Sequence, residues 1–184
     1  CSSTGSAPNR NGTISASFCS TMSLSPNSAG FTNNNLMEST ANSTLHFGDG
    51  PSPPAPGTIL ATANSTVQFV GSAVINGGNL STLGNGQMDI AANVVSTLNN
   101  VTLTTDSQFV VKNNGIAFVS GTLTNNGTFT LATIGSNTEI QIEGNTTFTG
   151  TGVFNLTSTN GGNDYIFAQN TTDTLTIDSG ITIQ

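Results

Sequence analysis

Hydrophobic residues recur about every twenty positions from residue 66 to the end of the chain. One series has spacings of 21, 21, 20 and 19 residues: Val67, Met88, Phe109, Phe129 and Phe148. Two further series run beside it: Val74, Val95, Ile116, Ile134, Phe154 and Leu175, and then Leu83, Leu103, Leu123 and Ile142. A sustained period of this length is the signature of a repeat architecture.

Around these positions apolar and polar residues alternate, which is typical of half-buried β-strands. The alternation is clearest in four segments: 67–69, 102–104, 128–131 and 174–177. Clusters of asparagine and glycine separate the segments: 76–78, 85–86, 113–115, 125–127 and 160–162. Asparagine and glycine accept the positive φ angles that tight corners need, so these clusters are predicted to be turns.

Three short strands per coil of about twenty residues predict an all-β fold, a right-handed parallel β-helix or β-solenoid whose inward side chains stack in columns. We expect this solenoid over residues 58–184. Residues 1–57 are expected to form an irregular N-terminal cap that ends in a proline-rich joint at 51–57. The alternative fold is an antiparallel β-sandwich, because Asn-Gly pairs between alternating strands are also hairpin signals. The persistence of the period favours the solenoid.

The composition restricts the partners. Only 6% of the 184 residues are charged, and the formal net charge is −7, with Arg10 and Lys112 as the only basic residues. Such a chain cannot neutralise several phosphates, which disfavours nucleic acid and anionic lipid as partners. No apolar run approaches the roughly 18 residues of a transmembrane helix, so we expect no membrane insertion.

Two kinds of covalent modification are predicted. Cys1 and Cys19 are the only cysteines, and in an exported protein they are expected to form a disulfide. Possible N-glycosylation sites are the nine Asn-x-Ser/Thr sequons, a number close to chance for this composition. The sequon asparagines are Asn11, Asn42, Asn64, Asn79, Asn100, Asn126, Asn145, Asn155 and Asn170.

The acidic residues are too thinly spread to predict a catalytic site, which in solenoid lyases and hydrolases needs several carboxylates on one face. Glu139 and Glu143 are expected to share an outer strand face, but no arginine lies near them in the sequence. Asp164 lacks the recurring Gly-x-Asp spacing of calcium-binding turns, and His46 is the only histidine. We therefore predict no catalytic residue, metal site or cofactor, and do not expect an enzyme.

Two segments resemble known repeats: GTLTNNGTFTL at 121–131, and the stretch from GTGVFNLTSTNGG to TLTIDSGITIQ at 150–184. They are similar to the rungs of secreted bacterial β-helix exoproteins, the haemagglutinin-like and autotransporter-passenger adhesins. The resemblance is good over about the last 65 residues and loose over 66–120. It implies a secreted, cell-surface protein with a structural or adhesive role, which binds glycans or proteins on a host or neighbouring cell. It carries over no site residues.

Two other functions remain open. Residues 181–184 are still in strand rhythm, and an open solenoid end can pair with further copies of the same chain. A self-assembling extracellular filament subunit is therefore the second hypothesis. The third is a carbohydrate-binding or carbohydrate-processing β-helix, for which processing requires at least three of the acidic residues in one cleft.

Overall fold

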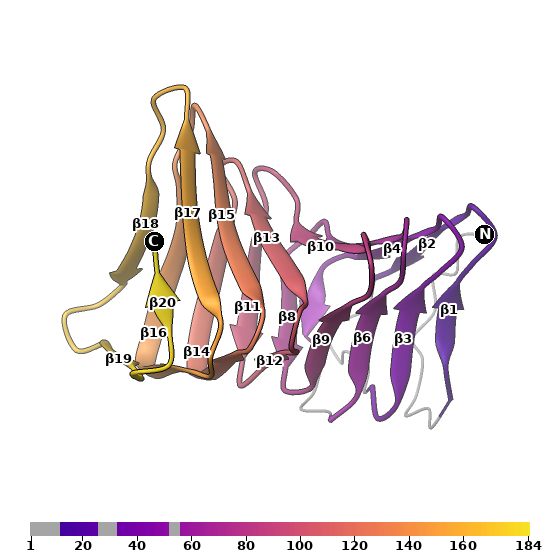
Figure 1. Cartoon of the computed structure of the whole chain (residues 1–184), viewed down its shortest axis with the longest axis horizontal. Helices are drawn as coiled ribbons and strands as arrows, with labels where there is room; N and C mark the ends of the chain where they lie inside the picture. The colour runs from indigo at the N-terminus through magenta and orange to yellow at the C-terminus, as the bar shows by residue number, and fades with distance from the viewer. Residues whose placement is uncertain (1–11, 26–32, 52–55) are drawn as a thin grey trace.

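A computed structural model of the chain describes residues 12–25, 33–51 and 56–184. The described residues form twenty strands and no helix, and every strand pair among them is parallel. The strands wind through about six turns of a β-solenoid, seen from the side in Figure 1. The predicted parallel β-solenoid is confirmed, and the antiparallel β-sandwich is wrong. The described residues hold no helix that is long and apolar enough to cross a membrane.

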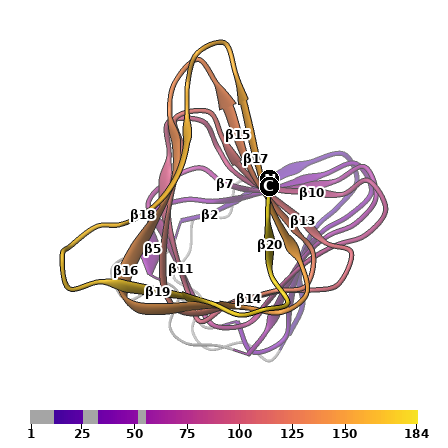
Figure 2. The same ribbon diagram turned by 60° about the vertical axis from the view of Figure 1, so that its left-hand side comes forward.

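Three faces give the coil the triangular cross-section of Figure 2. The first face is one sheet of eight strands. Along the axis these strands are β2 (Thr21–Leu24), β4 (Thr44–Phe47), β7 (Thr66–Phe69), β10 (Gln87–Ile90), β13 (Gln108–Lys112), β15 (Thr128–Ile134), β17 (Val153–Thr159) and β20 (Thr182–Ile183).

The second and third faces belong to one sheet, because the long strands β14 (Ile116–Asn125) and β16 (Thr138–Thr149) bend around the corner between them. The second face contains the first halves of these strands with β5 (Gly50–Pro51), β8 (Ala73–Asn76), β11 (Val95–Asn99) and β18 (Asp164–Ala168). The third face contains their second halves with β1 (Ile14–Ala16), β3 (Leu36–Ser39), β6 (Thr58–Ala61), β9 (Asn79–Thr82), β12 (Thr102–Leu103) and β19 (Thr174–Ile177).

The core is a stack of inward side chains that runs along the axis. Its largest members are phenylalanines, whose neighbouring ring centroids lie 4.5 to 5.9 Å apart. In order of contact they are Phe47, Phe69, Phe109, Phe129, Phe154 and Phe148. Offset ring pairs at these separations add to the hydrophobic stabilisation that comes from removing the rings from water.

The predicted column from Val67 through Met88 to Phe129 is confirmed. Val67 pairs with Met88 and Phe109 with Phe129, and the pairing of Asp89 with Val110 brings Met88 into line with Phe109. The predicted next member is wrong: Phe129 pairs with Phe154, whereas Phe148 pairs with Leu123 on the third face. The coil length is the reason. It is about 23 residues on average instead of twenty, and it grows from 20 at Phe109–Phe129 to 29 at Phe154–Ile183.

The other two predicted columns fail for the same reason. Val74 pairs with Thr97 instead of Val95, although Val95 does pair with Ile116. Leu83 and Ile134 point to solvent, with 56% and 60% of their surface exposed. Ile134 lies where β15 leads into a loop that projects from the rod beside the loop after β17 (Figure 1). Most of the extra residues of the coil from Phe129 to Phe154 lie in longer strands, since β15 has 7 residues against 5 in β13 and β16 has 12 against 10 in β14.

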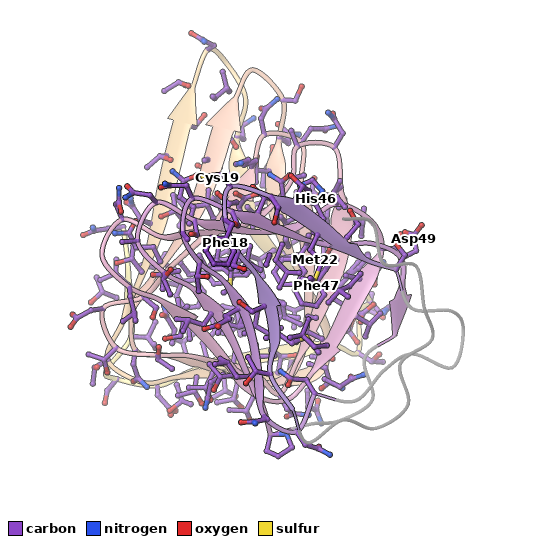
Figure 3. All side chains as sticks on the ribbon, turned by 90° about the vertical axis from the view of Figure 1, so that its right-hand side faces the viewer. Phe18, Cys19, Met22, His46, Phe47 and Asp49 are labelled. Carbon is purple, nitrogen blue, oxygen red and sulfur yellow. The ribbon has the colours of Figure 1, made fainter. Side chains whose placement is uncertain are left out.

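The predicted irregular cap over residues 1–57 also needs correction. In its described part, β1 to β4 pair in parallel with the coils that follow, and β5 pairs with β8. The alternation that builds these coils is visible in β4, where Leu45 and Phe47 are buried and their neighbours are not. In the end-on view of Figure 3, Met22 and Phe47 lie toward the centre and Asp49 lies at the rim. The solenoid therefore includes strands from Ile14 onward.

Asparagines at the corners bind one another between successive coils. Asn64 and Asn93 have φ angles of 60° and 62°, as expected of corner residues. The side-chain amide of Asn85 donates to Oδ1 of Asn64 at 2.5 Å, and that of Asn114 donates to Oδ1 of Asn93 at 2.8 Å. The frequent asparagine of the sequence thus satisfies the backbone geometry and links the coils.

Candidate functional site

Among the described residues, three of the four exposed or half-buried aromatic side chains outside the core lie on the second face. Tyr165 and Phe167 point outward from β18, and each is 41% exposed. Phe118 points outward from β14, between the buried residues Ala117 and Val119. Aromatic side chains exposed to water are unfavourable for a folded domain. A group of them on one surface therefore often marks a site of interaction.

The strand register places two polar side chains among these rings. Phe118, Gln141 and Phe167 lie on consecutive coils, and so do Ile116, Glu139 and Tyr165. Consecutive coils are separated by the usual strand spacing of about 4.8 Å. Figure 2 shows β16 and β18 on the same side of the triangle. We call Phe118, Glu139, Gln141, Tyr165 and Phe167 the aromatic patch.

A hydrogen bond orders the polar part of the aromatic patch. The amide of Gln141 donates to Oε2 of Glu139 at 2.6 Å, and both side chains are half-buried. Glu139 and Glu143 alternate with buried Ile140 and Ile142, so the predicted outward placement of both carboxylates is confirmed. Glu143 lies at the corner where β16 bends, away from the rings.

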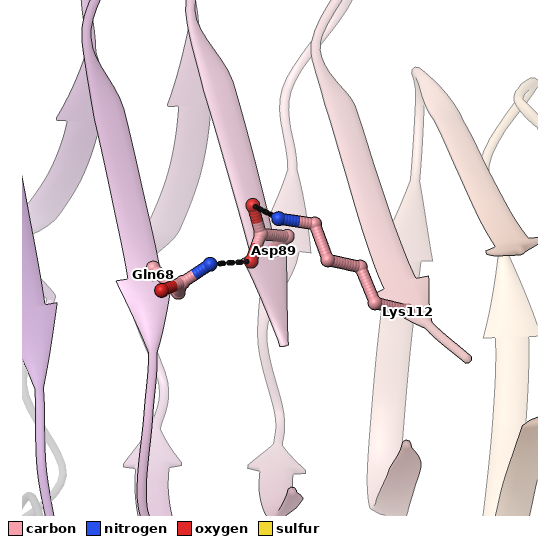
Figure 4. Close-up of polar contacts among 3 residues, drawn as sticks. All are labelled: Gln68, Asp89 and Lys112. Atoms are coloured by element: carbon pink, nitrogen blue, oxygen red, sulfur yellow. Dashed lines mark hydrogen bonds and ion pairs between the residues drawn. The ribbon is translucent and has the colours of Figure 1, made fainter. Parts of the chain in front are cut away.

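A second polar group lies on the first face, where Asp89 joins three coils (Figure 4). Lys112 of β13 approaches Asp89 with Nζ 2.8 Å from Oδ2, and Gln68 of β7 donates to Oδ1 at 2.8 Å. The Asp89 side chain is 2% exposed, and that of Lys112 is 41% exposed. The adjacent hollow of about 230 Å³ is lined by this one carboxylate among the described residues, so no acid and base pair for glycoside chemistry meets there.

Removing Lys112 should cost more stability than neutralising Asp89. We expect Lys112→Met to lower the free energy of unfolding by about 1–2 kcal/mol, since it leaves a buried carboxylate without its cation, while solvent access at Lys112 limits the loss. Asp89→Asn should cost less, because the freed ammonium group can be solvated. Urea denaturation followed by circular dichroism measures both. Equal losses would show that Asp89 is not held away from water.

Asp164 lies at the corner where the second face begins, in register with buried Thr138. Its Oδ1 accepts a hydrogen bond from Thr133, whereas its Oδ2 and the hydroxyl of Thr138 are buried without a partner. Burial raises the pKa of the Asp164 carboxyl above its ordinary value of 3.8, and the Thr133 hydrogen bond opposes this rise. One carboxylate with two hydroxyls does not make a calcium site, and no group of three metal-binding side chains occurs in the described residues.

The charge on Asp164 should weaken the fold as the pH rises. Because the native pKa lies above the unfolded one, the contribution of Asp164 is most favourable below pH 3.8 and is lost as the pH rises through the native pKa. Asp164→Asn removes this dependence and supplies an amide donor, so we expect a gain of about 1 kcal/mol at pH 7. Thermal unfolding from pH 3.5 to 7 tests it. The exposed Asp178→Asn variant is the control for the loss of one negative charge.

The remaining predicted residues are dispersed. His46 lies on the outer side of β4 beside Gln68, on the first face. Cys19 is exposed at the N-terminal end, where its thiol approaches the carbonyl oxygen of Ala41 at 3.6 Å (Figure 3). Cys1 lies outside the described residues, so the disulfide stays a prediction.

The sequons are spread over several corners and faces, and glycosylation also stays a prediction. Asn42, Asn64, Asn100, Asn145 and Asn170 are exposed, whereas Asn79, Asn126 and Asn155 are half-buried. Asn11 lies outside the described residues. The amide nitrogen of Asn170, to which a glycan would attach, is engaged by Asp173 at 2.9 Å.

The sequence alone predicted neither the aromatic patch nor the polar group around Asp89. Asp89 and Lys112 are far apart in the sequence, and only the strand register brings them together. Comparisons with protein-family models, with curated proteins and with solved structures find no match to this chain.

Proposed function

We propose that the chain is a segment of an extracellular, cell-surface rod with an adhesive or structural role and no catalytic one. The observation that carries this proposal is the aromatic patch, which lies on the surface of a solenoid with few charged residues. The Phe core runs from coil to coil, so that the faces are held in fixed positions along one axis. A rigid scaffold with a partly apolar surface region suits the presentation of a binding surface away from a cell.

Bead adhesion tests the adhesive role. Latex beads coated with the purified chain, at matched density, are washed over layers of animal, plant, fungal and bacterial cells. We expect retention on at least one of these layers above that of beads coated with albumin. Retention at the albumin level on every layer, by a chain that circular dichroism shows to be folded, would contradict an adhesive role.

A filament subunit is the second candidate, because the coils of a β-solenoid can also stack end to end between copies of one chain. Strands β18, β19 and β20 each pair on one side only. Ile177 and Ile183, which continue inward columns, are 45% and 42% exposed there. An edge of this kind accepts further strands, which can be those of a following coil of the same chain or those of another copy. Size exclusion with light scattering over a hundredfold concentration range distinguishes the two, since only a filament subunit gives growing polymers visible by negative-stain microscopy.

A further inference from the structure

The aromatic patch has the composition of a surface for sugar rings. A pyranose ring offers an apolar C–H face, which packs against an aromatic ring, and a rim of hydroxyl groups, which bind planar amides and carboxylates. The patch presents both kinds of group: Phe118 and Phe167 lie two coils apart, and Gln141 lies between them. Two coils correspond to about 9.6 Å along the axis. An extended ligand along the axis can therefore meet a ring, an amide and a second ring in turn.

The polar pair is arranged to bind hydroxyl groups. Because the Gln141 amide already donates to Oε2 of Glu139, the two planar groups are held in place before a ligand arrives. This hydrogen bond is the one side-chain hydrogen bond of either residue among the described contacts, so their other oxygens remain available as acceptors. Preordered acceptors reduce the entropy that binding would otherwise cost.

The charge of the surface selects among ligands. Lys112 is the only basic residue in the described part of the chain, and it is engaged by Asp89 on a different face. The aromatic patch itself carries Glu139, and the whole chain has a formal charge of −7. Acidic polysaccharides and nucleic acids would be repelled. A purely apolar protein partner would leave the Glu139 carboxylate to be buried without compensation, which is costly.

We propose that the aromatic patch binds a neutral polysaccharide chain that lies along the solenoid axis. The inference rests on the proposed adhesive function and names the ligand class of the surface that supports it. Tyr165 and Phe167 supply the rings with the greatest exposure, Phe118 supplies the third ring, and Glu139 with Gln141 binds hydroxyl groups. No covalent step is involved.

Affinity electrophoresis of the whole chain tests the proposal. The gels contain one of four neutral probes, namely β-glucan, xylan, mannan or galactan, and polygalacturonate serves as the acidic comparison. We expect retardation by at least one neutral probe and none by polygalacturonate. The double variant Tyr165→Ala with Phe167→Ala should weaken the binding roughly tenfold or more. The control is Ile134→Ala, which removes an even more exposed apolar side chain elsewhere and should bind like the parent.

The bead assay separates this inference from the proposed function. If no neutral polysaccharide is bound, or if the double variant binds as tightly as the parent, the glycan inference is overturned. Bead retention that survives in the double variant, or that disappears when the cells are treated with protease, would then keep the adhesive function and assign it to another surface or to a protein partner. If the parent protein shows neither polysaccharide binding nor bead retention, the glycan inference and the adhesive function are both overturned.

Discussion

Replacing Phe109 with alanine is expected to lower the free energy of unfolding by about 3–5 kcal/mol, the usual cost of a large buried aromatic side chain. Phe109 is fully buried, and its ring lies 5.9 Å from that of Phe69 and 4.9 Å from that of Phe129. Its loss would open a cavity in the middle of the stack, between the rings of Phe69 and Phe129. Urea denaturation followed by far-ultraviolet circular dichroism measures the change.

The control for this prediction is Phe167→Ala, which removes the same side chain from an outward position. Phe167 is 41% exposed and is in register with the polar Gln141, so its loss should cost less than about 1 kcal/mol. A similar loss for both variants would mean that the inward column does not dominate the stability of the solenoid.

Gly150→Ala should be the second most harmful substitution, with an expected loss of about 2–4 kcal/mol. Gly150 has a φ of 110°, which L side chains rarely adopt, and a Cβ atom there would lie 2.2 Å from the carbonyl oxygen of Asn125. That oxygen belongs to the backbone of the preceding coil, where it accepts a hydrogen bond from Gly152. Relieving the clash would therefore require one coil to move away from the next.

Gly144→Ala separates backbone strain from collision. Gly144 also has a positive φ, 65°, but a Cβ atom added there meets nothing within 4 Å. Only the strain of a left-handed conformation remains, and we expect a loss of about 1 kcal/mol. Thermal and urea denaturation of both variants provide the comparison. If Gly144→Ala cost as much as Gly150→Ala, close approach of the coils would not be the cause.

The fold was predictable because one property of the sequence repeats faithfully over part of its length. From Val67 to Phe129 the coils have 20 or 21 residues on the first face, so a simple period finds the true column. Beyond Phe129 the period fails, because residues are added to the strands as well as to the loops of the later coils while the strand pairs keep their register. A period cannot distinguish Phe148 from Phe154, since both are inward residues of neighbouring faces.

The candidate surface was predictable only in part. The outward position of Glu139 follows from its alternation with Ile140. Tyr165 and Phe167 alternate with Ile166 and could equally well have pointed inward, because apolar residues fill both sides of β18. Their exposure is decided by the register with Glu139 and Gln141, a long-range relation that the local pattern does not contain.

The unequal coil lengths have a mechanical consequence. Each coil contacts mainly its two neighbours, so a tensile load on the chain ends would detach coils one at a time. A detached coil of 21 residues releases about 70 Å of extended chain, whereas one of 29 residues releases about 100 Å. Under tension the protein would therefore lengthen in larger steps when it unfolds from its C-terminal coils. The step size in a single-molecule pulling trace would report which end unfolds first.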